Sequence, residues 1–226
     1  MRTINIAIDG PAGAGKSTIA KSAAKELGYI YVDTGALYRA IGVGALRAKI
    51  ETTDNDKVTD LLQDIKVELK FINGEQRVYL NGEDVSDEIR LPDASMAASN
   101  VSAIPSVREF LFSLQREIAE KNDVIMDGRD IGTVVLPNAQ IKIFLTASSE
   151  ERATRRHKEL ILKGHEVNYD DLLAEIKQRD YNDSTREIAP LKQADDAVLI
   201  DTTGNTLQQS IKQLTDIIKE KIDNFR

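Results

Sequence analysis

Near its start the chain reads Gly10-Pro11-Ala12-Gly13-Ala14-Gly15-Lys16-Ser17, directly after a short apolar stretch, Ile4 to Ile8. This octapeptide satisfies the pattern G-x-x-x-x-G-K-[ST] at every fixed position, and a chance match in such a chain has odds on the order of 1%. Glycines let the backbone turn its N–H groups inward around phosphate oxygens, and a helix expected from about Lys16 adds its positive end. The stretch therefore predicts a strand, a phosphate-binding loop and a helix.

The last residues of this loop have separate expected roles in a nucleoside triphosphate site. Lys16 is expected to reach the β- and γ-phosphates, while the Ser17 hydroxyl ligates Mg²⁺. A dinucleotide site competes, because Gly13-Ala14-Gly15 begins G-x-G-x-x-G and Asp33 follows at the distance of a ribose-binding acid. The third glycine of that pattern is replaced by Thr18, and the Lys-Ser pair would have no role there. We therefore expect residues Gly10 to Thr18 to bind the phosphates of a nucleoside triphosphate.

Composition and charge exclude several classes of protein. The 226 residues include 30 basic and 37 acidic side chains, a formal charge of −7, which disfavours binding to nucleic acid polymers. Cysteine is absent, so disulfides and thiolate metal sites are excluded. No apolar run approaches the roughly 18 residues of a membrane-spanning helix. We expect a cytoplasmic, soluble monomer that binds no membrane.

Five short apolar stretches alternate with segments of helical period. They are Ile4 to Ile8, Tyr29 to Val32, Val124 to Met126, Ile141 to Leu145 and Val198 to Ile200. Strands buried on both faces and separated by helices are typical of a parallel sheet, which gathers ligands beyond its carboxyl ends. The predicted fold class is α/β: a P-loop NTPase with a five-stranded parallel sheet flanked by helices.

One part of the chain departs from this alternation. Val67, Leu69 and Phe71 alternate with polar residues, and the pairs Asn73-Gly74 and Asn81-Gly82 follow at hairpin spacing. We expect a small antiparallel meander at about residues 66–90, within an inserted domain of residues 34–122. The P-loop core would then comprise residues 1–33 and 123–226.

Two further clusters carry charge at expected strand and helix ends. Asp127 follows the strand Val124 to Met126, where an acid can hold Mg²⁺ or its waters. Arginines gather at residues 152, 155 and 156 and again at 179 and 186. Arg179, Asp183 and Arg186 are spaced to share one face of a helix. Such groups are often solvated ion pairs, but here they suggest a basic helical lid, about residues 149–187, over a polyphosphate.

At these residues the sequence resembles the bacterial cytidylate kinases, a branch of the nucleoside monophosphate kinases. The resemblance runs from the Asp-Gly-Pro-Ala-Gly-Ala-Gly-Lys-Ser-Thr stretch at Asp9 to Ala189-Pro190-Leu191. Its most specific parts are Asp33-Thr34-Gly35-Ala36-Leu37-Tyr38-Arg39 and Asp127-Gly128-Arg129-Asp130-Ile131-Gly132-Thr133. It implies transfer of the ATP γ-phosphate to CMP or dCMP with Mg²⁺ as cofactor, and a monophosphate-binding domain at 34–122 whose meander is typical of bacterial members.

The resemblance also implies roles for individual residues. The cytosine would be read by Thr34, Arg108 and Asp130, the acceptor phosphate held by Arg39 and Arg129, and the ribose held by Ser99, Arg179 and Asp183. Arg186 would contact the phosphates or the sugar, Tyr38 would line the CMP site, and Arg155 and Arg156 would face ATP from the lid. Lys16, Arg129, Arg179 and Arg186 would be catalytic. The chemistry agrees, because cytosine offers an N4 amine beside the N3 and O2 acceptors.

Two alternatives stay open at this point. One is a P-loop kinase for another small acceptor, such as UMP. The other is a nucleotide-binding sensor that does not turn over, although it would leave Asp130, Arg129 and the Arg179 cluster without a role. ADP release from Mg·ATP over a panel of acceptors separates the three.

Overall fold

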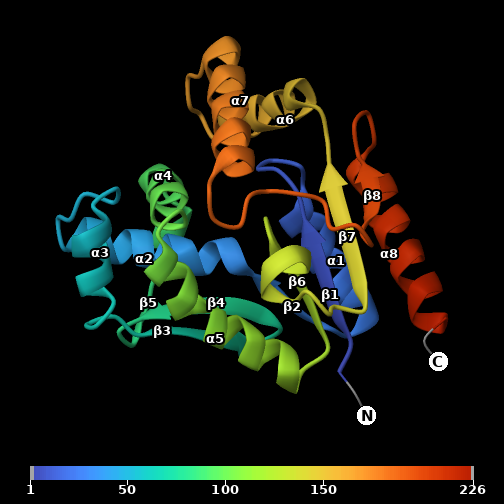
Figure 1. Cartoon of the computed structure of the whole chain (residues 1–226). Coiled ribbons are helices and arrows are strands. Elements are labelled where there is room, and N and C mark those ends of the chain that lie inside the picture. Colours follow the sequence, from blue (N-terminus) through green and yellow to red (C-terminus); the bar gives the residue numbers. More distant parts are fainter. Residues whose placement is uncertain (1–2, 225–226) are drawn as a thin grey trace. The chain divides into compact units, whose positions relative to one another are not determined.

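A computed structural model describes residues 3–224 of the chain (Figure 1). These residues form two compact units. The sheet unit holds the described residues up to Tyr31 and from Asp123 onward, and the inserted unit runs from Val32 to Asn122. The polypeptide therefore leaves the first unit once and returns to it once.

A five-stranded parallel sheet forms the centre of the sheet unit. Its strands are β1 (Asn5–Asp9), β2 (Ile30–Asp33), β6 (Val124–Gly128), β7 (Ile141–Thr146) and β8 (Val198–Asp201). The strand order is β2-β6-β1-β7-β8, so the strand before the glycine-rich loop lies in the middle. The predicted α/β fold with a parallel sheet is confirmed. Each predicted strand matches an observed one within one or two residues.

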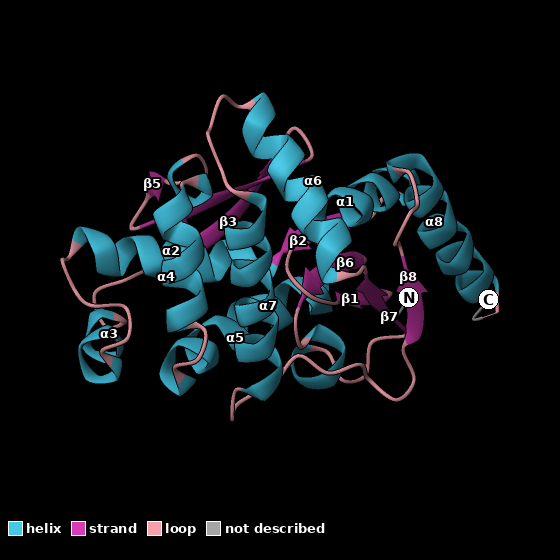
Figure 2. Ribbon diagram, turned by 90° about the horizontal axis from the view of Figure 1, so that it is seen from above, coloured by secondary structure: helices cyan, strands magenta, loops and turns pink. Residues whose placement is uncertain are grey.

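Some helices of the sheet unit pack against the sheet, and others lie beyond the carboxyl ends of its strands. The helices α1 (Lys16–Leu27) and α8 (Leu207–Asp223) lie side by side, as Figure 2 shows, and pack their apolar faces into one core with the sheet. A turn of π-type helix at Ile131–Val135 follows β6. Two further helices, α6 (Ser149–Leu162) and α7 (Tyr169–Thr185), pack on each other beyond the end of β7 (Figure 1).

The inserted unit combines helices with a separate antiparallel sheet. Its helices are α2 (Thr34–Arg47), α3 (Asn55–Leu61), a short 3-10 helix (Glu88–Arg90), α4 (Pro92–Val101) and α5 (Pro105–Lys121). Its strands are β3 (Val67–Ile72), β4 (Glu75–Leu80) and β5 (Glu83–Asp84), in the order β3-β4-β5. The core of this unit contains fully buried residues of α2 and α5, including Leu37, Ile41 and Leu111. No helix among residues 3–224 is long and apolar enough to span a membrane.

Both turns of the meander have the backbone conformation that their residues favour. Asn73 and Gly74 have φ angles of 54° and 77°, and Asn81 and Gly82 have φ angles of 50° and 84°. Two consecutive residues with positive φ make the turn whose twist suits an antiparallel hairpin. The predicted antiparallel meander is therefore confirmed and has three strands, with β3 and β4 paired from Val67 opposite Leu80 to Ile72 opposite Glu75.

Candidate functional site

The glycine-rich loop joins β1 to α1 in the sheet unit, as its motif requires. Gly10 lies so close to β7 that a Cβ on it would stand 1.9 Å from the carbonyl oxygen of Leu145. Gly15 precedes α1 with a φ of 88°, a left-handed conformation that glycine adopts without strain. The first N–H groups of α1 have no partners within the helix, so the loop has the groups needed to bind an anion.

Lys16 is buried at the base of this loop. Its side chain is 6% exposed, and its Nζ donates to the carbonyl oxygen of Pro11 at 2.8 Å. Burial and the charge of Arg129 lower the pKa of Lys16 to about 7, while Asp127 and Asp9 act in the opposite direction. An anion bound in the loop would favour the charged lysine, because opposite charges at short range raise the pKa of an ammonium group.

Asp127 joins the loop to the end of β6. One carboxylate oxygen accepts from the Ser17 hydroxyl and the other accepts from the Tyr31 hydroxyl, each at 2.9 Å. Sequence analysis identified Ser17 and Asp127 but not Tyr31, which anchors the carboxylate from β2. Among residues 3–224, no three His, Cys, Asp or Glu side chains group closely enough to hold a metal ion. A hydroxyl and one carboxylate nevertheless suit Mg²⁺, which binds few protein oxygens and keeps phosphate and water ligands.

Two ion pairs follow β6 in the sheet unit. Arg129 Nε donates to Asp183 Oδ2 at 2.8 Å, and Arg186 Nη2 lies 3.5 Å from Asp130 Oδ1. All four side chains are at most 20% exposed. The half-buried Arg179 lies on α7, one turn before Asp183. The structure therefore brings these sequence-predicted residues to one end of α7.

The expectation that Arg186 continues the helical face is wrong. Helix α7 ends at Thr185, and Arg186 has an extended ψ of 141°. Its Nε donates to the carbonyl oxygen of Ala189 at 2.7 Å, within a turn that precedes Pro190. Ala189 itself has a left-handed φ of 48°, which marks the turn in the chain here. Arg186 reaches Asp130 from this turn and not from the helix.

Asp9 is a residue that sequence analysis did not include among the candidate site residues. Its two carboxylate oxygens accept from the backbone N–H groups of Ile131 and Gly132, both at 2.7 Å. They hold the start of the turn that directly follows Asp130. Burial raises the pKa of Asp9 to about 6, against the lowering effect of these two hydrogen bonds. An acid ending a strand beside a phosphate loop was the signal that could have identified it.

Arg152, on α6, joins the helical pair to the glycine-rich loop. It is 4% exposed, and its guanidinium donates to the carbonyl oxygens of Ala147 at 2.9 Å and Ala12 at 3.0 Å. It also makes a two-pronged ion pair with Asp180 on α7. The sequence placed Arg152 in a basic cluster without singling it out, because its partners are distant along the chain.

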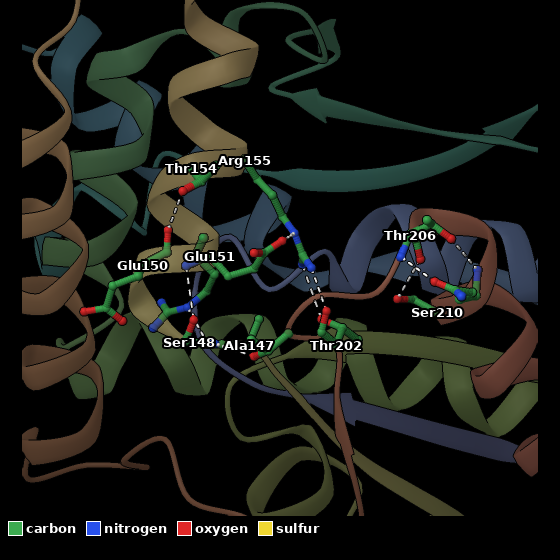
Figure 3. Close-up of polar contacts among 12 residues, drawn as sticks. Ala147, Ser148, Glu150, Glu151, Thr154, Arg155, Thr202, Thr206 and Ser210 are labelled. Carbon is green, nitrogen blue, oxygen red and sulfur yellow. Dashed lines mark hydrogen bonds and ion pairs between the residues drawn. The ribbon is translucent and has the colours of Figure 1, made fainter.

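The other two arginines of α6 have different partners. Figure 3 shows Arg155 extending from α6 to Thr202, whose carbonyl oxygen accepts from Nη2 at 2.7 Å, while Nε contacts Glu151 at 3.0 Å. Arg156 pairs with Glu159 at 3.2 Å and is 46% exposed. Arg155 thus ties the base of α6 to the segment that follows β8.

The remaining candidates belong to the inserted unit. Thr34 begins α2 and is 3% exposed, and Tyr38 lies one turn later. Arg108 on α5 is 2% exposed, its guanidinium carbon lies 5.8 Å from the centre of the Tyr38 ring, and it donates to the carbonyl oxygen of Ser102 at 3.3 Å. Ser99 lies half-buried on α4. Tyr38 and Arg108 therefore come together in the fold, although 70 positions separate their numbers in the chain.

Arg39 forms an ion pair at the start of α2. Its Nη2 donates to Asp33 Oδ2 at 2.7 Å, while Asp33 Oδ1 caps the helix by accepting from the N–H of Ala36 at 3.0 Å. The Nε of Arg39 is buried and has no hydrogen-bond partner within the described part of the chain. Since a guanidinium carries five N–H donors in a planar fork, Arg39 keeps donors for a ligand such as a phosphate.

Comparisons with known proteins agree over nearly the whole chain. The family model described as cytidylate kinase matches residues 6–220. A cytidylate kinase of Caldicellulosiruptor saccharolyticus is 54% identical over 224 residues, and one of Caldicellulosiruptor bescii is 52% identical over 224 residues. Both alignments cover 99% of this chain and 99% of the relative. Among solved structures, an uncharacterized protein from Eubacterium ventriosum matches with a TM-score of 0.53 at 15% identity, over 97% of this chain and 99% of that one, which supports the fold alone.

Proposed function

Because this chain belongs to the cytidylate kinase family, we propose that it transfers the γ-phosphate of ATP to CMP or dCMP, giving ADP and CDP or dCDP. The observation that carries the proposal is the arrangement at the start of α1, where Lys16 is buried and the buried Asp127 of β6 accepts from the Ser17 hydroxyl. A phosphate loop with an acid opposite its serine is what transfer from a nucleoside triphosphate requires.

ATP is bound by the loop from Gly10 to Thr18. Backbone N–H groups and the start of α1 hold the phosphates, and Lys16 meets the negative charge that develops during transfer. Ser17 and Asp127 hold Mg²⁺, which when bound neutralises charge on the phosphate oxygens. Arg155 and Arg156 are assigned to the ATP side of a lid formed by residues 149–187.

CMP is assigned to a second group of residues. Asp130 accepts from the cytosine N4 amine, while Arg108 and the Thr34 hydroxyl donate to the base, beside Tyr38. Arg39 and Arg129 hold the acceptor phosphate.

The sugar and the transferred group are held by a second set. Ser99, Arg179 and Asp183 are assigned to the ribose, and Arg186 to the phosphates or the sugar. Arg129, Arg179 and Arg186 act with Lys16 in stabilising the transferring phosphoryl group. No dedicated general base is needed, because transfer depends mainly on positioning and charge stabilisation.

The direct test is release of ADP from Mg·ATP over a panel of nucleoside monophosphates and small alcohols. Fast turnover with CMP and dCMP is expected, with UMP slower by about 5- to 150-fold, because uracil presents a carbonyl to Asp130 where cytosine presents an amine. If no acceptor raises the rate of ADP release above the rate without acceptor, the proposed kinase activity is contradicted.

Asp130→Ala tests the base-reading assignment separately. The variant should lose kcat/KM for CMP substantially and for UMP much less, so the ratio between them narrows. If Asp130 only orients a neighbouring arginine, both substrates lose equally and the ratio stays unchanged.

A further inference from the structure

The inserted antiparallel sheet makes a specific contact with the beginning of α2. Gln76, the second residue of β4, accepts from the backbone N–H of Asp33 through Oε1 at 2.8 Å. Its Nε2 donates to the backbone carbonyl of the same Asp33 at 3.2 Å. One side-chain amide therefore satisfies both backbone groups of one residue, as the peptide group of a neighbouring strand would.

Asp33 passes this constraint to two further groups. Its carboxylate caps α2 through Ala36 and holds the guanidinium of Arg39, so its backbone position sets where both of them lie. Packing around the pair is close, because a Cβ on Gly35 would lie 3.1 Å from Asp33 Oδ1 and 3.6 Å from Arg39 Nη1. The chain of contacts runs from Gln76 through Asp33 to Arg39, entirely within the inserted unit.

Arg39 is suited to pass this constraint on to a ligand. Its side chain is 28% exposed, one terminal nitrogen is held by Asp33, and Nε is buried without a hydrogen-bond partner in residues 3–224. A guanidinium held on one side by a carboxylate loses little rotamer freedom when its remaining donors meet a phosphate.

We infer that Gln76 is a positioning residue for Arg39, and that the inserted sheet thereby prearranges the arginine that binds the acceptor phosphate of CMP. The inference rests on the proposed function, since it takes Arg39 as a ligand of that phosphate. Gln76 itself contacts no substrate. It gives the antiparallel insertion a role in substrate binding through two hydrogen bonds to one residue.

The test replaces Gln76 by Met, which has similar length and no amide, and measures two ligands that differ by the phosphate. Binding of CMP is followed by calorimetry, and cytidine is measured as a competitor. Gln76→Met should weaken CMP by about five- to tenfold and leave cytidine within about twofold, because only CMP presents the group that Arg39 meets. The KM for ATP should stay unchanged.

A matched control lies at the next position of the same strand. Arg77 pairs with Asp84 inside the insertion, so Arg77→Met removes a polar contact of β4 without touching Asp33. It should leave the ratio of CMP to cytidine affinity unchanged. A loss specific to CMP in this variant would mean that general damage to the hairpin is responsible, and would overturn the inference.

Arg39→Met separates failure of the inference from failure of the proposed function. If Arg39→Met does not weaken CMP relative to cytidine, Arg39 is not the phosphate ligand and the assignment on which the inference rests is wrong. If Arg39→Met does weaken CMP binding relative to cytidine, but Gln76→Met leaves both affinities unchanged or lowers both equally, only the inference is overturned. In the double variant, Gln76→Met should add little to the loss of CMP affinity that Arg39→Met causes alone.

A second substitution keeps the test open if Gln76→Met folds poorly. Gln76→Glu retains an oxygen for the N–H of Asp33 but places a carboxylate oxygen where Nε2 donates to the carbonyl. It should lower CMP affinity relative to cytidine in the same direction as Gln76→Met, because two oxygen acceptors then face each other. Full retention of CMP affinity in this variant would count against the contact.

Discussion

Replacing Asp9 by Asn should change how the stability of the sheet unit depends on pH. Burial raises the pKa of this carboxyl from its ordinary value of 3.8 to about 6 in the folded protein. Between these two pH values the native state binds the proton more firmly than the unfolded chain does. Ionisation of Asp9 therefore lowers the free energy of unfolding as pH rises from about 4 to about 6, and the loss persists above that range.

The size of the effect follows from the shift. About two pKa units at about 1.4 kcal/mol each correspond to roughly 3 kcal/mol in total. About 2 kcal/mol of this falls between pH 4 and pH 7.5, because some of the unfolded chain is already ionised at pH 4. Asn does not titrate, so the variant lacks this component. The free energy of unfolding of the wild type minus that of the variant should thus fall by about 2 kcal/mol between pH 4 and pH 7.5.

Urea unfolding of both proteins at a series of pH values measures this difference, with a spectroscopic probe placed in the five-stranded sheet. Lost hydrogen bonds or altered packing change the variant's free energy of unfolding by the same amount at each pH. They therefore do not alter how the difference between the two proteins varies with pH. Carbon-13 NMR of the Asp9 carboxyl gives the folded-state pKa independently. A difference that is flat or rises with pH would refute the reasoning, as would a carboxyl that titrates near its ordinary value.

Three further predictions concern other residues of the sheet unit. Lys16→Ala should lower kcat by about a hundredfold or more while leaving the circular dichroism spectrum unchanged, since it meets developing charge; near-normal turnover would contradict the phosphate-loop assignment. Asp180→Asn removes the charge that compensates the buried Arg152 and should cost about 2 kcal/mol, or about 5 °C in thermal midpoint, measured by calorimetry; an unchanged midpoint would show that the pair contributes nothing. Asp183→Ala should reduce kcat/KM unequally for CMP and dCMP, because only CMP carries a 2′-hydroxyl. Equal losses would show that Asp183 does not contact the 2′-hydroxyl.

Features with a local cause were predictable from the sequence. The strand before the loop, the helix after it and the two Asn-Gly turns each depend on residues adjacent in the chain, and all were predicted at their observed places. The end of α7 was misjudged because spacing alone extended the helix to Arg186, whereas the helix ends at Thr185.

Contacts across long stretches of chain were not predictable in the same way. Asp9 binds backbone N–H groups at Ile131 and Gly132, and such groups occur at nearly every residue, so no side-chain pattern identifies the partners. Gln76 likewise contacts the backbone of Asp33. These residues act by holding others in place, and only the folded arrangement shows which ones they hold. The substrate roles assigned to site residues stay predictions.

The central position of β1 has a consequence for how the chain acquires its structure. β1 is made first, yet its neighbours are β6 and β7, with Asn5 opposite Val124 and Ile6 opposite Ile141. Closing so long a loop is entropically costly and slow, whereas the inserted unit is continuous in the chain and is synthesised completely before β6 emerges. We expect the inserted unit to fold first on the ribosome. Until β6 and β7 are synthesised, the apolar stretch Ile6–Ile8 has no strands to pair with. It is then free to associate with the wrong segments or chains.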